Sequence, residues 1–155
     1  MTTPSSFAKQ IQTLINTSGT WTETNPAFAI VKFPWNVSRN FEYHAARKGP
    51  WKNMIWCLQD RKTPRELAGP GPYQTYGVDV NVYCYSRATS ELEADVNTAE
   101  VQAENMRVQV EARIDANPTG LTGAVQMRKN GGFQLNDPNG NPAIFIEVVK
   151  VLVIL

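Results

Sequence analysis

The chain has 155 residues, of which 42% are hydrophobic and 19% are charged. This length fits a single domain over residues 1–155, and the apolar fraction excludes an intrinsically disordered chain. Fifteen Lys and Arg residues against fourteen Asp and Glu residues leave a net charge of +1, which excludes a uniformly basic nucleic-acid binder. Cys57 and Cys84 each stand inside an apolar stretch, so we expect two buried free thiols and no metal site.

Neither end of the sequence predicts a secretion signal or a membrane span. The first ten residues, MTTPSSFAKQ, have no basic region followed by an apolar run. The longest apolar stretch, AIFIEVVKVLVIL, is interrupted by Glu147 and Lys150 and is shorter than the roughly 20 residues that cross a bilayer. We therefore expect synthesis in the cytoplasm and no membrane contact.

The first predicted element is a helix with Thr3 as its cap and Pro4 at its first position. Its apolar side chains recur at spacings of four and three, and Ser18-Gly19 ends it. A strand is predicted over Ala27–Phe33. Residues 36–53 show no clear period and fit an irregular strand or a loop equally well.

A pair of strands is predicted next. Met54–Asp60 is a short apolar run, and Tyr76–Ser86 alternates strictly between apolar and more polar residues, which is the strongest strand signal in the chain. Between them, residues 61–75 are rich in Pro and Gly, which predicts a long extended loop. We expect an extended hairpin over this region.

A long helix is predicted over Ser90–Ala116. Ser90 and Glu93 have the spacing of a capping box, and the helix is expected to end before Asn117-Pro118. A single apolar stripe at spacings of three and four predicts the side that packs on a sheet; its members are Leu92, Val96, Ala99, Ala103, Met106, Val110 and Ile114. Val101 and Val108 lie off this stripe and either broaden it or touch a neighbouring subunit.

The remainder of the chain is predicted as strands separated by turns. Turn signals occur at Asn130-Gly131-Gly132 and over residues 136–140, and a long final strand covers Ala143–Leu155. Both faces of the final strand are apolar from Val148 onward, apart from Lys150. Helices would cover one face, so we expect a second copy of the chain to cover the other, at Val149, Val151 and Val153. The alternative is a sheet folded onto itself like a barrel.

The order of these elements predicts an α+β fold. Strands precede and follow the long helix, which favours a mostly antiparallel sheet of four to five strands with two helices packed on one face.

Catalytic signals are weak. The chain has one histidine, His44, so every nucleophile–histidine arrangement would depend on it. The sequence lacks phosphate-binding and metal-binding motifs, and we expect no enzyme activity, cofactor or metal. The alternative from another class is a small-ligand-binding or enzymatic domain, whose pocket would be lined by Trp35, Tyr43, Trp51 and Trp56 with His44 and Arg47.

Charge is distributed unevenly along the chain. Residues 39–65 carry seven basic and two acidic residues, whereas residues 89–116 carry seven acidic residues and two arginines. The basic region either attracts nucleic-acid phosphates without reading bases or meets the acidic helix of a neighbouring subunit. The candidate contacts with a partner or with DNA are Arg47, Lys48, Lys52, Arg61, Lys62 and Arg65.

The succession of elements resembles the tail-terminator, or tail-completion, proteins and related neck proteins of tailed bacteriophages. An amphipathic helix over Phe7–Ile15 is followed by the extended hairpin Met54–Ser86 and by the acidic helix Ser90–Ala116, which comes after a strand of the type VDVNVYCYS. A hairpin through the Asp-Pro-Asn-Gly turn at Asn136–Gly140 closes the chain. The resemblance covers nearly the whole sequence and is one of architecture, since it includes no signature motif.

This resemblance implies a structural virion protein without catalytic activity. Such proteins form homo-oligomeric, typically hexameric, rings that join the tail tube to the neck and let DNA pass. The implied partners are further copies of the chain, tail-tube proteins and neck or connector proteins, with passing DNA as a non-specific contact. The implied location is the neck or tail of the virion, after synthesis in the host cytoplasm. Another head–tail connector or minor tail protein is the alternative within this class.

Overall fold

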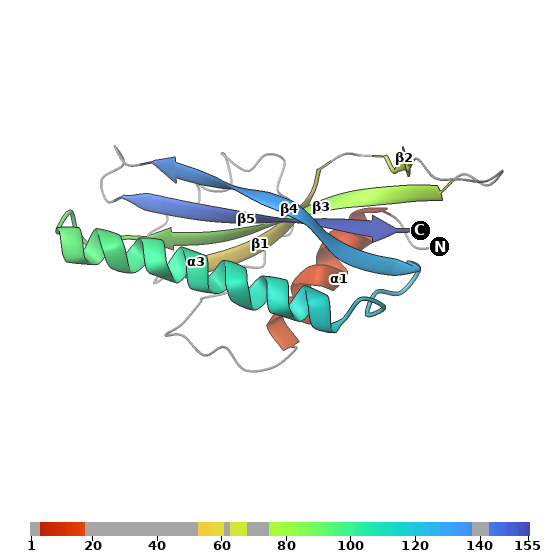
Figure 1. The fold of residues 1–155 in the computed structure, drawn as a ribbon, viewed down its shortest axis with the longest axis horizontal. Helices are drawn as coiled ribbons and strands as arrows, with labels where there is room; N and C mark the ends of the chain where they lie inside the picture. Colours follow the sequence, from red (N-terminus) through yellow and green to blue (C-terminus); the bar gives the residue numbers. More distant parts are fainter. Residues whose placement is uncertain (1–3, 18–52, 61–62, 68–74, 138–142) are drawn as a thin grey trace.

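The computed structural model describes residues 4–17, 53–60, 63–67, 75–137 and 143–155 (Figure 1). In this part of the chain there are two helices and five strands. In chain order they are α1 (Pro4–Thr17), β1 (Asn53–Gln59), β2 (Arg65–Leu67), β3 (Thr75–Arg87), α3 (Glu93–Ala116), β4 (Gln126–Asp137) and β5 (Ile144–Ile154). The predicted α+β class, antiparallel sheet and two packed helices are confirmed.

All five strands belong to one antiparallel sheet with the order β1-β3-β5-β4. β2 pairs with β3 from Arg65↔Gly77 to Leu67↔Thr75, beyond the segment of β3 that pairs with β1. The predicted hairpin therefore exists, but the Pro/Gly-rich region between its strands also contributes the short strand β2. The predicted strand Ala27–Phe33 and the unassigned residues 36–53 lie almost wholly outside the described residues; only Asn53 is described, as the first residue of β1.

Both helices lie on the same side of the sheet (Figure 1). The helix side chains Phe7, Ile11 and Ile15 and the α3 residues Met106 and Val110 join one buried cluster with the strands. The strand residues facing the helices are Ile55, Cys57, Val78, Val80, Val82, Cys84, Met127, Val149, Val151 and Val153. We call this side of the sheet the helix face.

The opposite side of the sheet, the aromatic face, holds a second buried cluster. Trp56 of β1 stacks on Tyr83 of β3 with ring centroids 5.4 Å apart, and Ile146 and Val148 of β5 belong to the same cluster. Val148 is fully buried, so both faces of β5 are buried within a single copy of the chain. The two-sided apolar pattern of β5 therefore does not require a second subunit, which corrects our reason for expecting one there.

The ends of α3 differ partly from the prediction. The helix ends at Ala116 as expected, but its N-cap is Leu92, which makes no side-chain cap hydrogen bond. Ser90 accepts a hydrogen bond from the backbone N–H of Leu92 and donates to Asp95 instead of capping the helix. Leu92 is 70% exposed and does not belong to the buried stripe. The other predicted stripe residues are buried or half-buried.

The predicted turn at residues 130–132 is wrong, because β4 runs continuously through it. The pairing with β5 shifts register between Lys129 and Gly132, which is a β-bulge rather than a reversal of the chain. Gly131 has a φ of 82°, a conformation that glycine adopts without steric cost. A Cβ on Gly132 would lie 2.3 Å from the Val148 carbonyl oxygen, so this position also excludes any side chain.

Candidate interaction surfaces

Of the six basic residues that we predicted to contact a partner or DNA, only Arg65 is among the described residues; Arg47, Lys48, Lys52, Arg61 and Lys62 lie outside them. Arg65 forms two hydrogen bonds with Asp79 across β2 and β3, with Nε–Oδ2 at 2.5 Å and Nη2–Oδ1 at 3.1 Å. The hydrogen bonds to Asp79 raise the pKa of Arg65. This paired guanidinium attaches β2 to β3 within the subunit.

The five valines that we predicted as subunit contacts fall into two groups. Val149, Val151 and Val153 are buried in the cluster beneath α1 and α3, which corrects their assignment as contact residues. Val101 and Val108 are 54% and 51% exposed. The sequence pattern of β5 showed two apolar faces, but it could not show which of them the helices cover.

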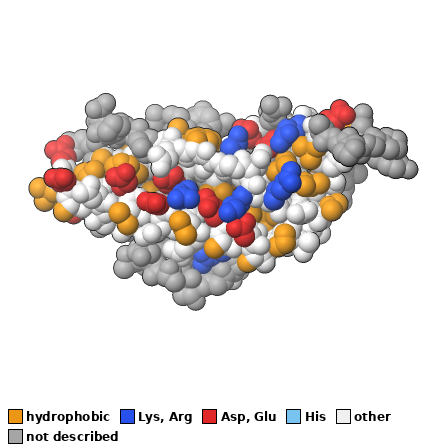
Figure 2. Space-filling view, viewed as in Figure 1, with side chains coloured by type: hydrophobic (Ala, Val, Ile, Leu, Met, Phe, Trp, Pro, Cys, Tyr) orange, Lys and Arg blue, Asp and Glu red, His pale blue; other side chains and the backbone are white. Residues whose placement is uncertain are grey.

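The exposed valines lie on the side of α3 that faces away from the sheet. Each is two positions from buried residues of the helix, and two positions correspond to a rotation of about 200°. Glu104 is three residues after Val101 and four before Val108, which places it beside both on the helix surface. We call Val101, Glu104 and Val108 the α3 outer patch. Figure 2 shows acidic side chains along the course of α3, with hydrophobic ones between them.

Ion pairs connect one flank of α3 to the sheet. Within the helix Arg107 Nη1 lies 3.0 Å from Glu111 Oε1, and between helix and sheet Lys129 Nζ of β4 lies 2.9 Å from Asp115 Oδ2. Hydrogen bonding raises the pKa of Arg107, through Glu111, and of Lys129, through Asp115. Glu104 takes little part in this network: its nearest atom to Arg107 is 3.7 Å away, and its side chain is 61% exposed. Glu104 is therefore the acid of the α3 outer patch that is available to another molecule.

A second exposed apolar surface lies on the aromatic face at the edge of the sheet. Phe133 and Leu135 of β4 are both 41% exposed and are the register partners of Val148 and Ile146. Arg128 pairs in register with Leu152, and Lys150 of β5 is two residues from both Val148 and Leu152, so both cations lie on the same face. We call Arg128, Phe133, Leu135 and Lys150 the sheet-edge patch.

The sequence analysis missed this patch because it interpreted residues 130–132 as a turn. With β4 continuous through the bulge, the alternation of Phe133, Gln134 and Leu135 next to two cations is the signal that would have revealed it. Neither Arg128 nor Lys150 forms an ion pair within the described residues.

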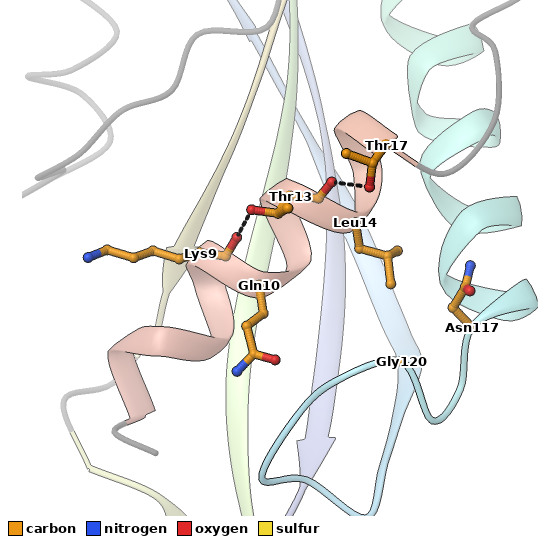
Figure 3. A pocket seen from close by; sticks show the side chains of 7 residues that line it. All are labelled: Lys9, Gln10, Thr13, Leu14, Thr17, Asn117 and Gly120. Atoms are coloured by element: carbon orange, nitrogen blue, oxygen red, sulfur yellow. Dashed lines mark hydrogen bonds between the residues drawn. The ribbon is translucent and has the colours of Figure 1, made fainter. Parts of the chain in front are cut away.

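A hollow of about 480 Å³ lies between α1 and the segment that follows α3 (Figure 3). Leu14 points into it toward Asn117 and Gly120, whereas Lys9 points away. The hydroxyls of Thr13 and Thr17 donate to carbonyls of their own helix, at 3.0 and 2.8 Å. Apart from the amine of Lys9, the lining offers amides, already bonded hydroxyls and one aliphatic side chain, and it holds no carboxylate, histidine or thiol beside that amine.

The described residues place no predicted catalytic group in an open site. His44 lies outside them, as do Trp35, Tyr43, Arg47 and Trp51 of the alternative pocket, while Trp56 is fully buried in its aromatic stack. Cys57 and Cys84 are buried free thiols, as predicted, and burial raises the pKa of both. Within the described part of the chain, no three His, Cys, Asp or Glu side chains are grouped to hold a metal ion.

Neither helix of the described residues has the length and apolarity of a membrane-crossing helix. Comparison of the chain with protein-family models and with curated proteins gives no match.

Proposed function

We propose that this chain is a structural protein of the neck of a tailed bacteriophage, a tail terminator that assembles into a homo-oligomeric ring. The ring would join the tail tube to the neck proteins, leave a passage for DNA and catalyse no reaction. The proposal is supported by the order of elements, in which a first helix, an extended antiparallel hairpin, a long acidic helix and a final antiparallel pair follow one another.

The observation that supports assembly into a ring is the α3 outer patch. Two valine side chains about half exposed lie two helical turns apart and face away from the core, and they are the apolar surface that a neighbouring subunit would cover. Burying apolar surface of this kind contributes about 25 cal/mol for each Å² removed from water. The acidic surroundings of these valines keep the free subunit soluble and restrict the choice of partner.

The proposal is tested by the particle that the purified chain forms. We expect multi-angle light scattering to give a multiple of 17.3 kDa and negative-stain microscopy to show closed rings. Changing both Val101→Glu and Val108→Glu should reduce the mass to that of a monomer without unfolding it, because both side chains point outward. Leu92→Glu is the matched control, since Leu92 is still more exposed but lies outside the patch. A wild-type chain that stays monomeric at high concentration contradicts the proposal.

A further inference from the structure

We propose that the subunits associate head to tail, with the α3 outer patch of one copy seated on the sheet-edge patch of the next. This inference rests on the proposed function, because it specifies which two surfaces meet in the ring. The occupant of each patch is a second copy of this chain.

The two patches lie on opposite sides of the subunit, so a contact between them is head to tail. α3 packs on the helix face of the sheet, and its outer patch points away from that face. Phe133 and Leu135 project from the opposite, aromatic face, as their register partners Val148 and Ile146 do. Two different surfaces on opposite sides of one subunit form a heterologous contact, and repetition of such a contact gives a closed ring when the rotation closes.

The chemistry of the two patches is complementary. Each combines a pair of exposed apolar side chains with charges of one sign: two valines beside Glu104 on α3, and Phe133 with Leu135 beside Arg128 and Lys150 on the sheet. The helix has six acidic residues and two arginines, and both arginines take part in interactions within the subunit. Apolar groups surrounded by opposite charges bury against each other and set the orientation of the contact.

Pairing of like patches is disfavoured by the same charges. Two α3 outer patches would bring Glu104 toward Glu104 of the second copy, and two sheet-edge patches would bring four cations together. The edge of β4 is also protected against direct strand addition, since it carries Arg128, Lys129 and a bulge, which natural edge strands use to prevent pairing. The contact is therefore expected through side chains of the aromatic face rather than through the backbone of the edge strand.

The test uses two variants of the full chain that each lose one patch. The first carries Val101→Asp and Val108→Asp, and the second carries Phe133→Asp and Leu135→Asp. Each variant alone should be a folded monomer of 17.3 kDa by analytical ultracentrifugation, with wild-type circular dichroism. An equimolar mixture at several hundred micromolar should form a heterodimer of twice that mass, because it retains one intact contact, and no ring.

Other outcomes separate this inference from the proposed function. Dimers of either variant alone show pairing of like patches and overturn the head-to-tail contact, as does a mixture that stays monomeric. If both variants still form rings of the wild-type size, the head-to-tail contact between these two patches is wrong, but the proposed ring-forming function is not contradicted. A monomeric wild type overturns both proposals.

A charge exchange gives a second test that leaves the apolar groups in place. Glu104→Lys should raise the protein concentration needed for ring assembly at least tenfold at low salt, and adding Arg128→Glu with Lys150→Glu should restore it. Glu93→Lys is the matched control, because it makes the same charge change at an exposed position of α3 that is eight residues before Val101 and outside the patch. Equal effects of Glu104→Lys and Glu93→Lys, or no rescue by the reversed cations, contradict the assignment.

Discussion

Strands β4 and β5 are neighbours of nearly equal length, yet they occupy different environments. β5 lies between β3 and β4, and both of its faces are buried. Among the described strands β4 lies at the edge of the sheet, and Met127 is the only buried residue among its described side chains. Val148 and Phe133 are register partners on the same face, but Val148 is fully buried and Phe133 is 41% exposed. The two strands therefore have different roles because of their positions in the sheet. β5 contributes mainly to the stability of the subunit, whereas β4 offers exposed side chains for contact with another molecule.

The largest difference in stability is expected between two variants that carry the same new charge, one at Val148 and one at Phe133. Val148→Asp should unfold the subunit, because an unpaired carboxylate in the aromatic cluster costs roughly 3–5 kcal/mol, a large part of the stability of a small domain. Phe133→Asp should change the free energy of unfolding by no more than about 1 kcal/mol, because the side chain reaches water. Urea denaturation followed by circular dichroism measures both. Equal losses would show that β4 is as much a part of the core as β5.

A smaller effect on stability is expected at the bulge of β4, where this strand pairs with β5. Gly132→Ala should destabilise the subunit by about 2–3 kcal/mol, because its Cβ would collide with the backbone carbonyl of Val148, which cannot move without disturbing β5. Gly131→Ala is the control: its Cβ meets open space, and the positive φ costs about 1 kcal/mol. Thermal melting of the two variants compares them, and a more stable Gly132→Ala variant would contradict the close approach.

The smallest effect per residue is expected from the thiols of the buried strands. The pKa of Cys57 and of Cys84 is raised above the ordinary value of 9.0 by burial. Below pH 9 the thiols are neutral in both the folded and the unfolded chain, and they add no pH dependence. Above it only the unfolded chain ionises, so each thiol lowers the free energy of unfolding by up to about 1.4 kcal/mol per pH unit.

The contribution of the thiols is isolated by comparing the wild type with a Cys57→Ala, Cys84→Ala double variant. Urea denaturation at pH 8 and pH 10 should show a smaller loss of stability in the double variant, although it starts from a lower value because of the atoms removed from the core. Identical losses in the two proteins would mean that the thiols ionise without unfolding.

Local patterns in the sequence were sufficient for most of the fold. Strict alternation in β3, the spacing of Met106 and Val110 in α3, and Pro4 at the start of α1 predicted elements that the structure contains at nearly the same bounds. Period and propensity act over a few residues, so the sequence alone reveals them. Spacing also placed Val101 and Val108 off the apolar stripe of their helix, but it left open whether they broaden that stripe, and the structure shows that both are about half exposed.

The tertiary structure decided what depends on distant neighbours. Alternation in β5 grouped Val149 with Val151 and Val153, but with two apolar faces it could not indicate which one the helices cover. Gly131 and Gly132 have the composition of a turn, and only pairing with β5 makes them a bulge in a continuous strand. Arg65 has the sequence context of a loop cation, and only the register of β2 on β3 brings it to Asp79. In each case the deciding interaction joins residues well separated in sequence, or elements whose packing the local pattern does not specify.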